Sequence, residues 1–384
     1  MKPAYRGRDS SQALEEGSAM TTRREFLRTS AAAAGLVFVG CDLLAARPAR
    51  AQARRREVFV DGKRVKTIDV HAHCAVPEAL TLLNLKLAGP GLRTDLDMAT
   101  QLGVRLQAMD EQGIDVQALS INPNWYKVDR DLAKQVCAIQ NEKLAAACAA
   151  NPDRFVAFAT VALQHPDLAA EQLEEGVKRF GLRGAGIGGN VGGMEISDRK
   201  FDPFWAKAEA LGVPVFIHPQ GDGAPDQLNS RFQGNGYLGN VIGNPLETTI
   251  ALSHLIFEGT LDRYPRLKII GAHGGGFLPS YSGRSDFGCP TRPDLCPGGT
   301  HGTIKKKPSD YLKQMYYDTM VFNPEGVRHL AVEVGSSQLL VGTDYPYPWT
   351  KTQVDLILQT PGFSDVDRAA ILGGTAATLL KIAI

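Results

Sequence analysis

The chain has 384 residues, of which 42 are lysine or arginine and 41 are aspartate or glutamate, so its formal net charge is +1. A chain this close to neutral lacks the basic excess of nucleic-acid-binding proteins, so we expect no nucleic-acid partner. Hydrophobic residues make up 43% and charged residues 22% of the chain. These values are typical of a globular protein and exclude a disordered or fibrous one.

Residues 1–51 are predicted to be a twin-arginine export signal that is removed, rather than part of the fold. Arg23 and Arg24 form the arginine pair, and an apolar stretch over residues 31–44 follows. Ala49-Arg50-Ala51 offers a small-x-small cleavage site. The apolar stretch is too short for a permanent bilayer-spanning helix, so we expect no stable membrane span. The signal predicts a periplasmic protein that uses the twin-arginine export machinery.

Two points about this N-terminal region stay open. The residues that lead up to Cys41 partly resemble a lipoprotein cleavage box, so a lipid anchor on Cys41 is the alternative to simple cleavage. Met20 directly precedes the arginine motif, so translation could start there or at Met1.

Cysteine usage gives little support for structural zinc, because the chain has no CxxC pair. Cys289 and Cys296 could bridge a proline-rich loop in an oxidising compartment or remain free thiols.

From residue 66 onward, strand-like and helix-like segments alternate. Predicted strands span 66–71, 115–120, 155–163, 183–187, 213–217, 267–272, 314–319 and 338–341, and predicted helices span 104–112, 129–150, 168–180, 201–211, 246–261 and 365–381. This alternation favours an α/β fold, a single (β/α)₈ barrel over residues 52–384. An open doubly wound sheet is the alternative. The GxGxxG string at 184–189 lies within a strand and opens no helix, so it does not indicate a dinucleotide site.

Polar side chains mark the ends of four predicted strands. Side chains alternate along a strand, so His71 and His73 face the same side. His218, His273 and Asp344 each end a later apolar strand, and barrel strands end together at the C-terminal mouth. Several histidines with a carboxylate and an open position are typical of a catalytic metal. The pattern predicts one divalent cation and no organic cofactor.

Six segments, in their order and spacing, resemble the metal-dependent amidohydrolase superfamily, and within it the branch of aminocarboxymuconate-semialdehyde decarboxylase. The resemblance runs from Ile68 nearly to the C-terminus. The segments are 68–73 (IDVHAH), 115–120 (DVQALS), 245–249 (PLETT), 272–276 (AHGGG), 292–296 (RPDLC) and 342–346 (GTDYP).

The resemblance also implies roles for individual residues. His71, His73, His218 and Asp344 would hold the metal, usually zinc, although nitrogen and oxygen ligands also accept manganese or iron. His273 would move a proton at the metal site, and Asp344 would share in the catalytic site. Two arginines would bind the substrate carboxylate across a homodimer interface, with a plain salt bridge as the alternative role. They are Arg284 and Arg292.

The sequence departs from the family's pattern around the substrate. The family carries another arginine after its first strand, where Arg93 is the candidate replacement here. It also uses tryptophans after the strand-five histidine, whereas residues 220–244 contain none. We therefore expect a small-molecule carboxylate different from that of the namesake decarboxylase.

Three functions follow from these residues. The first is a periplasmic, metal-dependent carboxy-lyase acting on an unsaturated or aromatic carboxylic acid. The second uses the same site to hydrolyse a lactone, amide or ester, or to hydrate an alkene. The third is a non-catalytic metal or solute binder, against which His273 argues because a pure binder does not need it.

Overall fold

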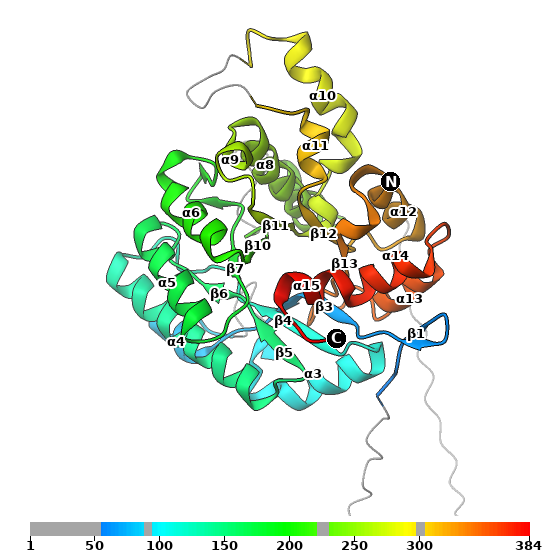
Figure 1. Cartoon of the computed structure of the whole chain (residues 1–384). Helices are drawn as coiled ribbons and strands as arrows, with labels where there is room; N and C mark the ends of the chain where they lie inside the picture. The colour runs from blue at the N-terminus through cyan, green and yellow to red at the C-terminus, as the bar shows by residue number, and fades with distance from the viewer. Residues whose placement is uncertain (1–54, 88–93, 221–229, 297–303) are drawn as a thin grey trace, which may run out of the picture. The chain divides into compact units, whose positions relative to one another are not determined.

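The computed structural model describes residues 55–87, 94–220, 230–296 and 304–384 (Figure 1). The predicted export signal over residues 1–51 and the candidate substrate residue Arg93 lie outside the described residues, so both stay predictions. Within the described ranges, no helix combines the length and the apolarity that a bilayer crossing requires.

A closed ring of parallel strands forms the centre of the fold (Figure 1). One sheet has the order β13-β12-β11-β10-β7-β6 and another the order β3-β4-β5. The ring strands are β3 (Ile68–His73), β4 (Val116–Ser120), β5 (Phe155–Ala157), β6 (Ala159–Thr160), β7 (Ala185–Ile187), β10 (Pro214–Ile217), β11 (Lys268–Gly271), β12 (Tyr316–Asp318) and β13 (Leu339–Leu340).

Two junctions join these sheets into a barrel. Between β5 and β6, the N–H of Phe158 donates to Leu119 on one neighbour and the N–H of Ala159 donates to Gly184 on the other side. Bridges from Asp69 to Val341 and from Ala72 to Tyr345 close the ring between β3 and the segment after β13. The predicted (β/α)₈ barrel is confirmed.

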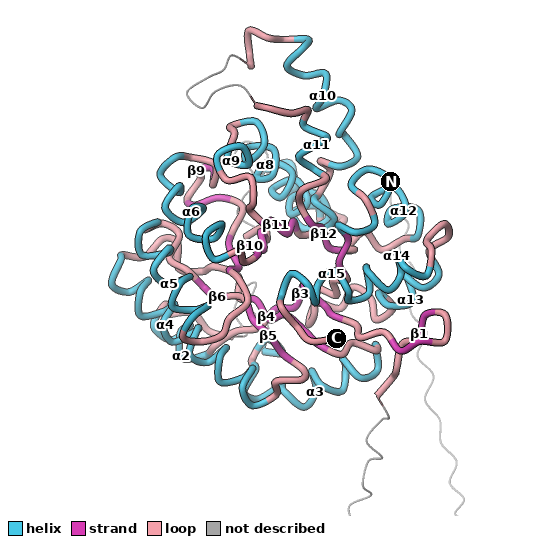
Figure 2. Tube along the Cα trace, viewed as in Figure 1, coloured by secondary structure: helices cyan, strands magenta, loops and turns pink. Residues whose placement is uncertain are grey.

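Helices surround the ring of strands on its outside (Figure 2). They bury their apolar sides against the strands, in a layer that includes Trp205 of α6 and Leu255 of α8. The larger helices are α3 (Met98–Gln112), α4 (Arg130–Ala150), α5 (Pro166–Lys178), α6 (Asp202–Leu211), α8 (Asn244–Phe257), α10 (Ser282–Thr291) and α12 (Pro324–Val334). Shorter ones are α2 (Pro77–Leu82), α9 (Thr260–Arg263), α11 (Pro308–Leu312), α13 (Gln353–Gln359), α14 (Asp365–Ala369) and α15 (Thr375–Leu380).

A second apolar cluster fills the barrel interior. It combines strand residues such as Val116, Phe216 and Ile270 with Ala376 and Leu380 of α15, all buried. Since Val116 opens its strand, α15 closes the N-terminal end of the barrel. The opposite end is left for the polar residues that follow the strands.

Some predicted elements are divided in the structure. The strand expected over 155–163 is split at Phe158, where its pairing passes from one neighbour to the next. The helix expected over 246–261 is interrupted at Gly259, whose φ of 72° favours glycine. The helix expected over 365–381 contains a π-helical turn at Ala370–Gly374. The string at 184–189 lies in β7 and the turn after it, and the short strands β8 (Asn190–Val191) and β9 (Met194–Glu195) follow as an antiparallel pair.

The segment around α10 extends away from the ring of helices (Figure 1). Cys289 and Cys296 form a disulfide there, with their Cα atoms 5.3 Å apart, which decides between the two alternatives left open for these cysteines. Tyr281, Phe287 and Leu295 on the same segment are all more than half exposed.

Candidate metal centre

A β-bulge in β3 directs both histidines of the first motif into the barrel. Asp69 pairs with Gln117 and Ala72 with Leu119, so β3 holds one residue more than β4 between these two positions. Val70 belongs to the interior apolar cluster, and the ring of the next residue, His71, also faces inward. Bulges change the direction of side chains in this way next to active sites.

The structure brings the four predicted metal ligands together at the barrel mouth. One ligand atom from each of His71, His73, His218 and Asp344 lies within 4.8 Å of the other three. Atoms bonded to one ion at about 2.0–2.2 Å lie at most about 4.4 Å apart, so this spread is close to that of a metal site. All four residues are buried, with exposed fractions from 0% to 7%.

The donor atoms themselves fit a cation. The Nε2 atoms of His71 and His73 face each other at 3.1 Å, and Oδ1 of Asp344 lies 3.2 Å and 2.9 Å from them. Two lone pairs at this distance repel unless a proton or a cation lies between them. In addition, Nδ1 of His218 is buried without a hydrogen-bond partner. Nitrogen and carboxylate donors of this kind suit zinc, manganese or iron.

Asp318, which was not predicted from the sequence, hydrogen-bonds to a predicted metal ligand and to the backbone beside it. Its fully buried carboxylate accepts a hydrogen bond from Nδ1 of His71 at 2.6 Å, which leaves Nε2 of that ring to face the cluster. It also accepts backbone N–H groups of His273 at 3.0 Å and Gly274 at 2.9 Å. Asp318 ends β12 as the other site residues end their strands, so the same rule could have found it.

Electrostatics within the cluster keep one carboxylate ionised and most of the rings neutral. Burial opposes ionisation of Asp344, yet the positive charge and hydrogen bonding of His71 and His73 hold its pKa well below the usual range. Burial also opposes protonation of His71, but the carboxylates of Asp344 and Asp318 raise its pKa to about 10. For His218, burial and the neighbouring rings lower the pKa well below 6.5.

His273 lies beside the predicted ligands, as expected for an acid/base. Its ring centroid is 5.3 Å from that of His71 and 5.2 Å from that of His218. Its Nδ1 is buried without a hydrogen-bond partner. Burial, reinforced by positive charge on His71, lowers its pKa to about 4, so the ring is neutral at pH 7 and able to accept a proton.

The turn that carries His273 has little space for larger residues. His273 has a φ of 54°, and Gly274, Gly275 and Gly276 all have positive φ values. A Cβ atom on Gly276 would lie 2.1 Å from the carbonyl oxygen of Pro245, so only glycine fits there.

A buried polar network fixes the outer side of the same strands. The carboxylate of Asp69 accepts from Thr343 at 2.6 Å and from Gln117 at 2.9 Å. Arg105 on α3, only 1% exposed, donates to Gln117 at 3.1 Å and to the backbone oxygen of His73 at 2.5 Å. Burial raises the pKa of Asp69 to about 6. This network was not predicted, because nothing in the helix pattern distinguishes Arg105 from a solvated arginine.

The predicted substrate arginines lie on or just after the extended α10. Arg284 is exposed in this segment, and Arg292 forms an exposed ion pair with Asp294 at 2.5 Å. Neither belongs to the buried cluster in a single chain. Their role across a dimer interface stays a prediction, as does the role of Arg93.

Residues 68–382 match the amidohydrolase family. The chain belongs to the amidohydrolase family. It is 32% identical to the 2-amino-3-carboxymuconate-6-semialdehyde decarboxylase of Dictyostelium discoideum, over 73% of this chain and 76% of that protein. It is also 30% identical to the gamma-resorcylate decarboxylase of Rhodococcus jostii, over 82% of this chain and 98% of that protein. The predicted resemblance to the aminocarboxymuconate-semialdehyde decarboxylase branch is confirmed.

Solved structures share this fold, and one of them contains a bound metal. A dihydroxybenzoic acid decarboxylase from Polaromonas sp. JS666, crystallised with manganese and the inhibitor 2-nitroresorcinol, superposes with a TM-score of 0.70. The two chains are 29% identical, and the match covers 83% of this chain and 97% of that one. That structure contains manganese, whereas zinc is the metal predicted from the sequence.

Proposed function

We propose that the protein is a metal-dependent, non-oxidative decarboxylase of an unsaturated or aromatic carboxylic acid. The observation that carries this proposal is the convergence of His71, His73, His218 and Asp344, with His273 beside them. Relatives that act as decarboxylases cover most of the chain, so the predicted reaction class is confirmed.

The chain's own residues bind the acid and move the proton. When bound, the divalent cation polarises a substrate oxygen. Neutral His273 takes a proton from the substrate or from water, and an anionic substrate beside it raises its low pKa and so favours the protonated form. His273 then delivers the proton to the carbon that bears the carboxylate. The carbon–carbon bond breaks, its electron pair restores the double bond, and carbon dioxide leaves.

Assays of carbon dioxide release test the proposal. The purified protein is incubated with candidate acids, 2,6-dihydroxybenzoate and 5-carboxyvanillate among them, and with lactones and esters. Gas release in proportion to loss of an acid is the expected result. Release of new acid from a lactone or ester without gas would favour the hydrolase instead, and no turnover of any candidate would favour a binder.

The metal is proposed to be a single zinc ion, and the ligand set supports manganese or iron as well. Elemental analysis of protein purified without added metal gives the identity and the stoichiometry. A ratio of one cation per chain is expected.

We further propose a homodimer formed through the α10 segment, with Arg284 of each subunit reaching the partner's site. The exposed apolar side chains of Tyr281, Phe287 and Leu295 support this, because such residues clustered on one projecting segment are typical of interfaces. Sedimentation of the purified protein gives its oligomeric state.

We also propose that the protein is exported to the periplasm through its twin-arginine signal, on the strength of Arg23 and Arg24. Fractionation of cells that express the full chain, compared with Arg23→Lys/Arg24→Lys, tests this. Loss of the periplasmic fraction in the variant is expected. Membrane retention of the wild type that depends on Cys41 would instead support the lipid anchor.

A further inference from the structure

A tryptophan in the loop after β13 is hydrogen-bonded to the metal centre. The indole Nε1 of Trp349 donates to Oδ2 of Asp344 at 2.7 Å. The other carboxylate oxygen, Oδ1, is the one that faces His71 and His73. The indole therefore hydrogen-bonds to the carboxylate oxygen that does not face the two histidines. This bond holds the carboxylate of Asp344 in the orientation that directs a single oxygen toward the predicted metal site.

The backbone of this loop keeps the indole next to the carboxylate. The N–H of Asp344 donates to the carbonyl oxygen of His71 at 2.8 Å, and Asp344 has a φ of 57°. Two further backbone hydrogen bonds fold the loop, from Tyr347 to Asp344 at 2.8 Å and from Trp349 to Tyr347 at 2.9 Å. The position of the indole thus follows from a local turn that is fixed to β3.

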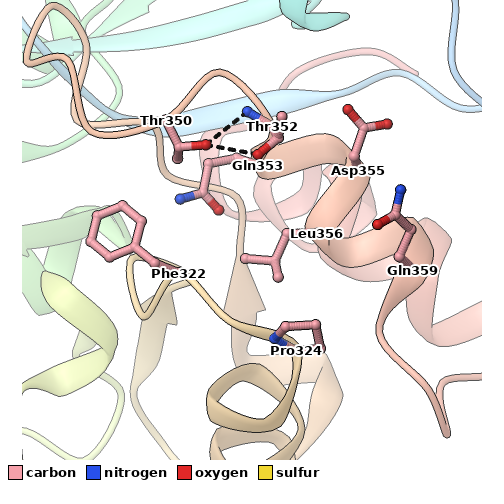
Figure 3. Close-up of a pocket in the computed structure, with 8 residues that line it drawn as sticks. All are labelled: Phe322, Pro324, Thr350, Thr352, Gln353, Asp355, Leu356 and Gln359. Carbon is pink, nitrogen blue, oxygen red and sulfur yellow. Dashed lines mark hydrogen bonds between the residues drawn. The ribbon is translucent and has the colours of Figure 1, made fainter.

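The rest of the indole ring faces outward among other aromatic side chains. Trp349 is 37% exposed. The centroid of its ring lies 6.2 Å from that of Tyr237, with 26° between the ring planes, and 5.6 Å from that of Phe322, with 40° between the planes. Tyr237 and Phe322 are 66% and 44% exposed. The three come from different loops at the barrel mouth, and Phe322 also lines a pocket of about 280 Å³ together with Thr350 and Leu356 (Figure 3). Exposed aromatic rings gathered in this way are typical of ligand sites.

The other two tryptophans show what a purely structural role looks like. Trp125 and Trp205 are fully buried, and their Nε1 atoms donate to the backbone carbonyls of Val161 and Ile196. Only Trp349 bonds to a predicted metal ligand, and only its ring is accessible to solvent.

We propose that Trp349 is a positioning residue for Asp344, and that its ring forms, with Tyr237 and Phe322, the surface on which the unsaturated part of the substrate stacks. The second half rests on the proposed function. In this arrangement the loop after β13 supplies a tryptophan, which residues 220–244 after His218 lack, and Tyr237 of that segment supplies a second ring. One side chain then links metal ligation to recognition of the substrate's π system.

Two substitutions of Trp349 distinguish the role of its N–H group from the role of its aromatic ring. Trp349→Phe keeps a ring and removes the donor, whereas Trp349→Leu removes both. Manganese affinity is measured by electron paramagnetic resonance, without substrate. We expect it to fall about 10–100-fold in both variants. Phe59→Leu removes an exposed ring of β1 (Phe59–Val60), outside this cluster, and serves as the control that leaves affinity unchanged. Wild-type affinity in Trp349→Phe would overturn the positioning role.

The role of the aromatic ring is tested by measuring KM at a saturating concentration of metal. We expect KM to stay within about threefold of wild type in Trp349→Phe and to rise about tenfold further in Trp349→Leu. Equal KM values in the two variants would overturn the stacking surface. Because the other tryptophans are buried, acrylamide quenching reports on Trp349, and 2-nitroresorcinol should protect it. Protection without any carbon dioxide release would contradict the proposed function while leaving the stacking surface intact, and absence of protection would contradict the surface.

Discussion

The metal centre and the α10 segment differ in how their functional residues are held. His71 lies in β3, Asp318 ends β12 and Asp344 follows β13 of one closed barrel. All three are buried and bond to one another or to the backbone. Arg284 and Arg292 are exposed on a segment that extends from the barrel. The barrel of a single chain therefore brings the predicted metal ligands together, whereas the proposed capture of the substrate carboxylate by these arginines would take place across a dimer interface.

The largest effect is expected from loss of a predicted metal ligand. In His73→Ala, one of the four predicted ligands is missing, so the cation should be lost and turnover should fall below detection. Elemental analysis and the carbon dioxide assay are run on the same sample. Treating the wild type with a strong chelator should have the same effect, and one equivalent of Mn²⁺ or Zn²⁺ should restore activity only to the wild type. Full turnover in chelator would remove the basis for any metal-dependent mechanism.

Substitution of His273 should separate chemistry from metal binding. His273→Ala should retain the cation but lose about 10²–10⁴-fold in kcat, because a positioned proton donor and acceptor is missing. His329→Ala is the matched control, since His329 is exposed and its ring pairs with Ser280 rather than with a residue of the metal centre. Unchanged kcat in His273→Ala would exclude the acid/base role and leave room for a binding protein.

Substitution of Asp318 tests whether a residue that hydrogen-bonds to a metal ligand contributes to metal binding. Asp318→Asn keeps the shape but loses the charge that accepts from His71 and from three backbone N–H groups. We expect metal affinity or activity to fall about 10–100-fold. Asp167→Asn breaks an exposed ion pair with Arg130 and should change neither quantity. An Asp318→Asn protein with wild-type affinity would show that the barrel holds His71 without this bond.

The sequence predicts well what depends on repeated strands and their ends. His218 and Asp344 could be found because each follows an apolar strand, and Asp318 obeys the same rule after Tyr317. The β3 bulge could not be found, since an alternating pattern contains no sign of an extra residue. Trp349 was also missed, because its contact with Asp344 depends on the conformation of a loop.

The smallest effect, and the one that bears most directly on the α10 segment, concerns Arg284. Arg284→Ala should raise KM about tenfold, as loss of one charge-assisted hydrogen bond does. If Arg284 acts across a dimer, mixing Arg284→Ala and His273→Ala subunits restores intact sites, because each mixed dimer combines one good arginine with one good histidine. Equal mixing makes half the dimers mixed, with one intact site in two. Measured with substrate well below KM, where Arg284→Ala alone keeps only about a tenth of the wild-type rate, roughly a quarter of wild-type activity should therefore return. Activity no higher than the average of the two separate variants would place Arg284 outside the partner's site, and the carboxylate would then have to be bound by residues of the barrel mouth itself.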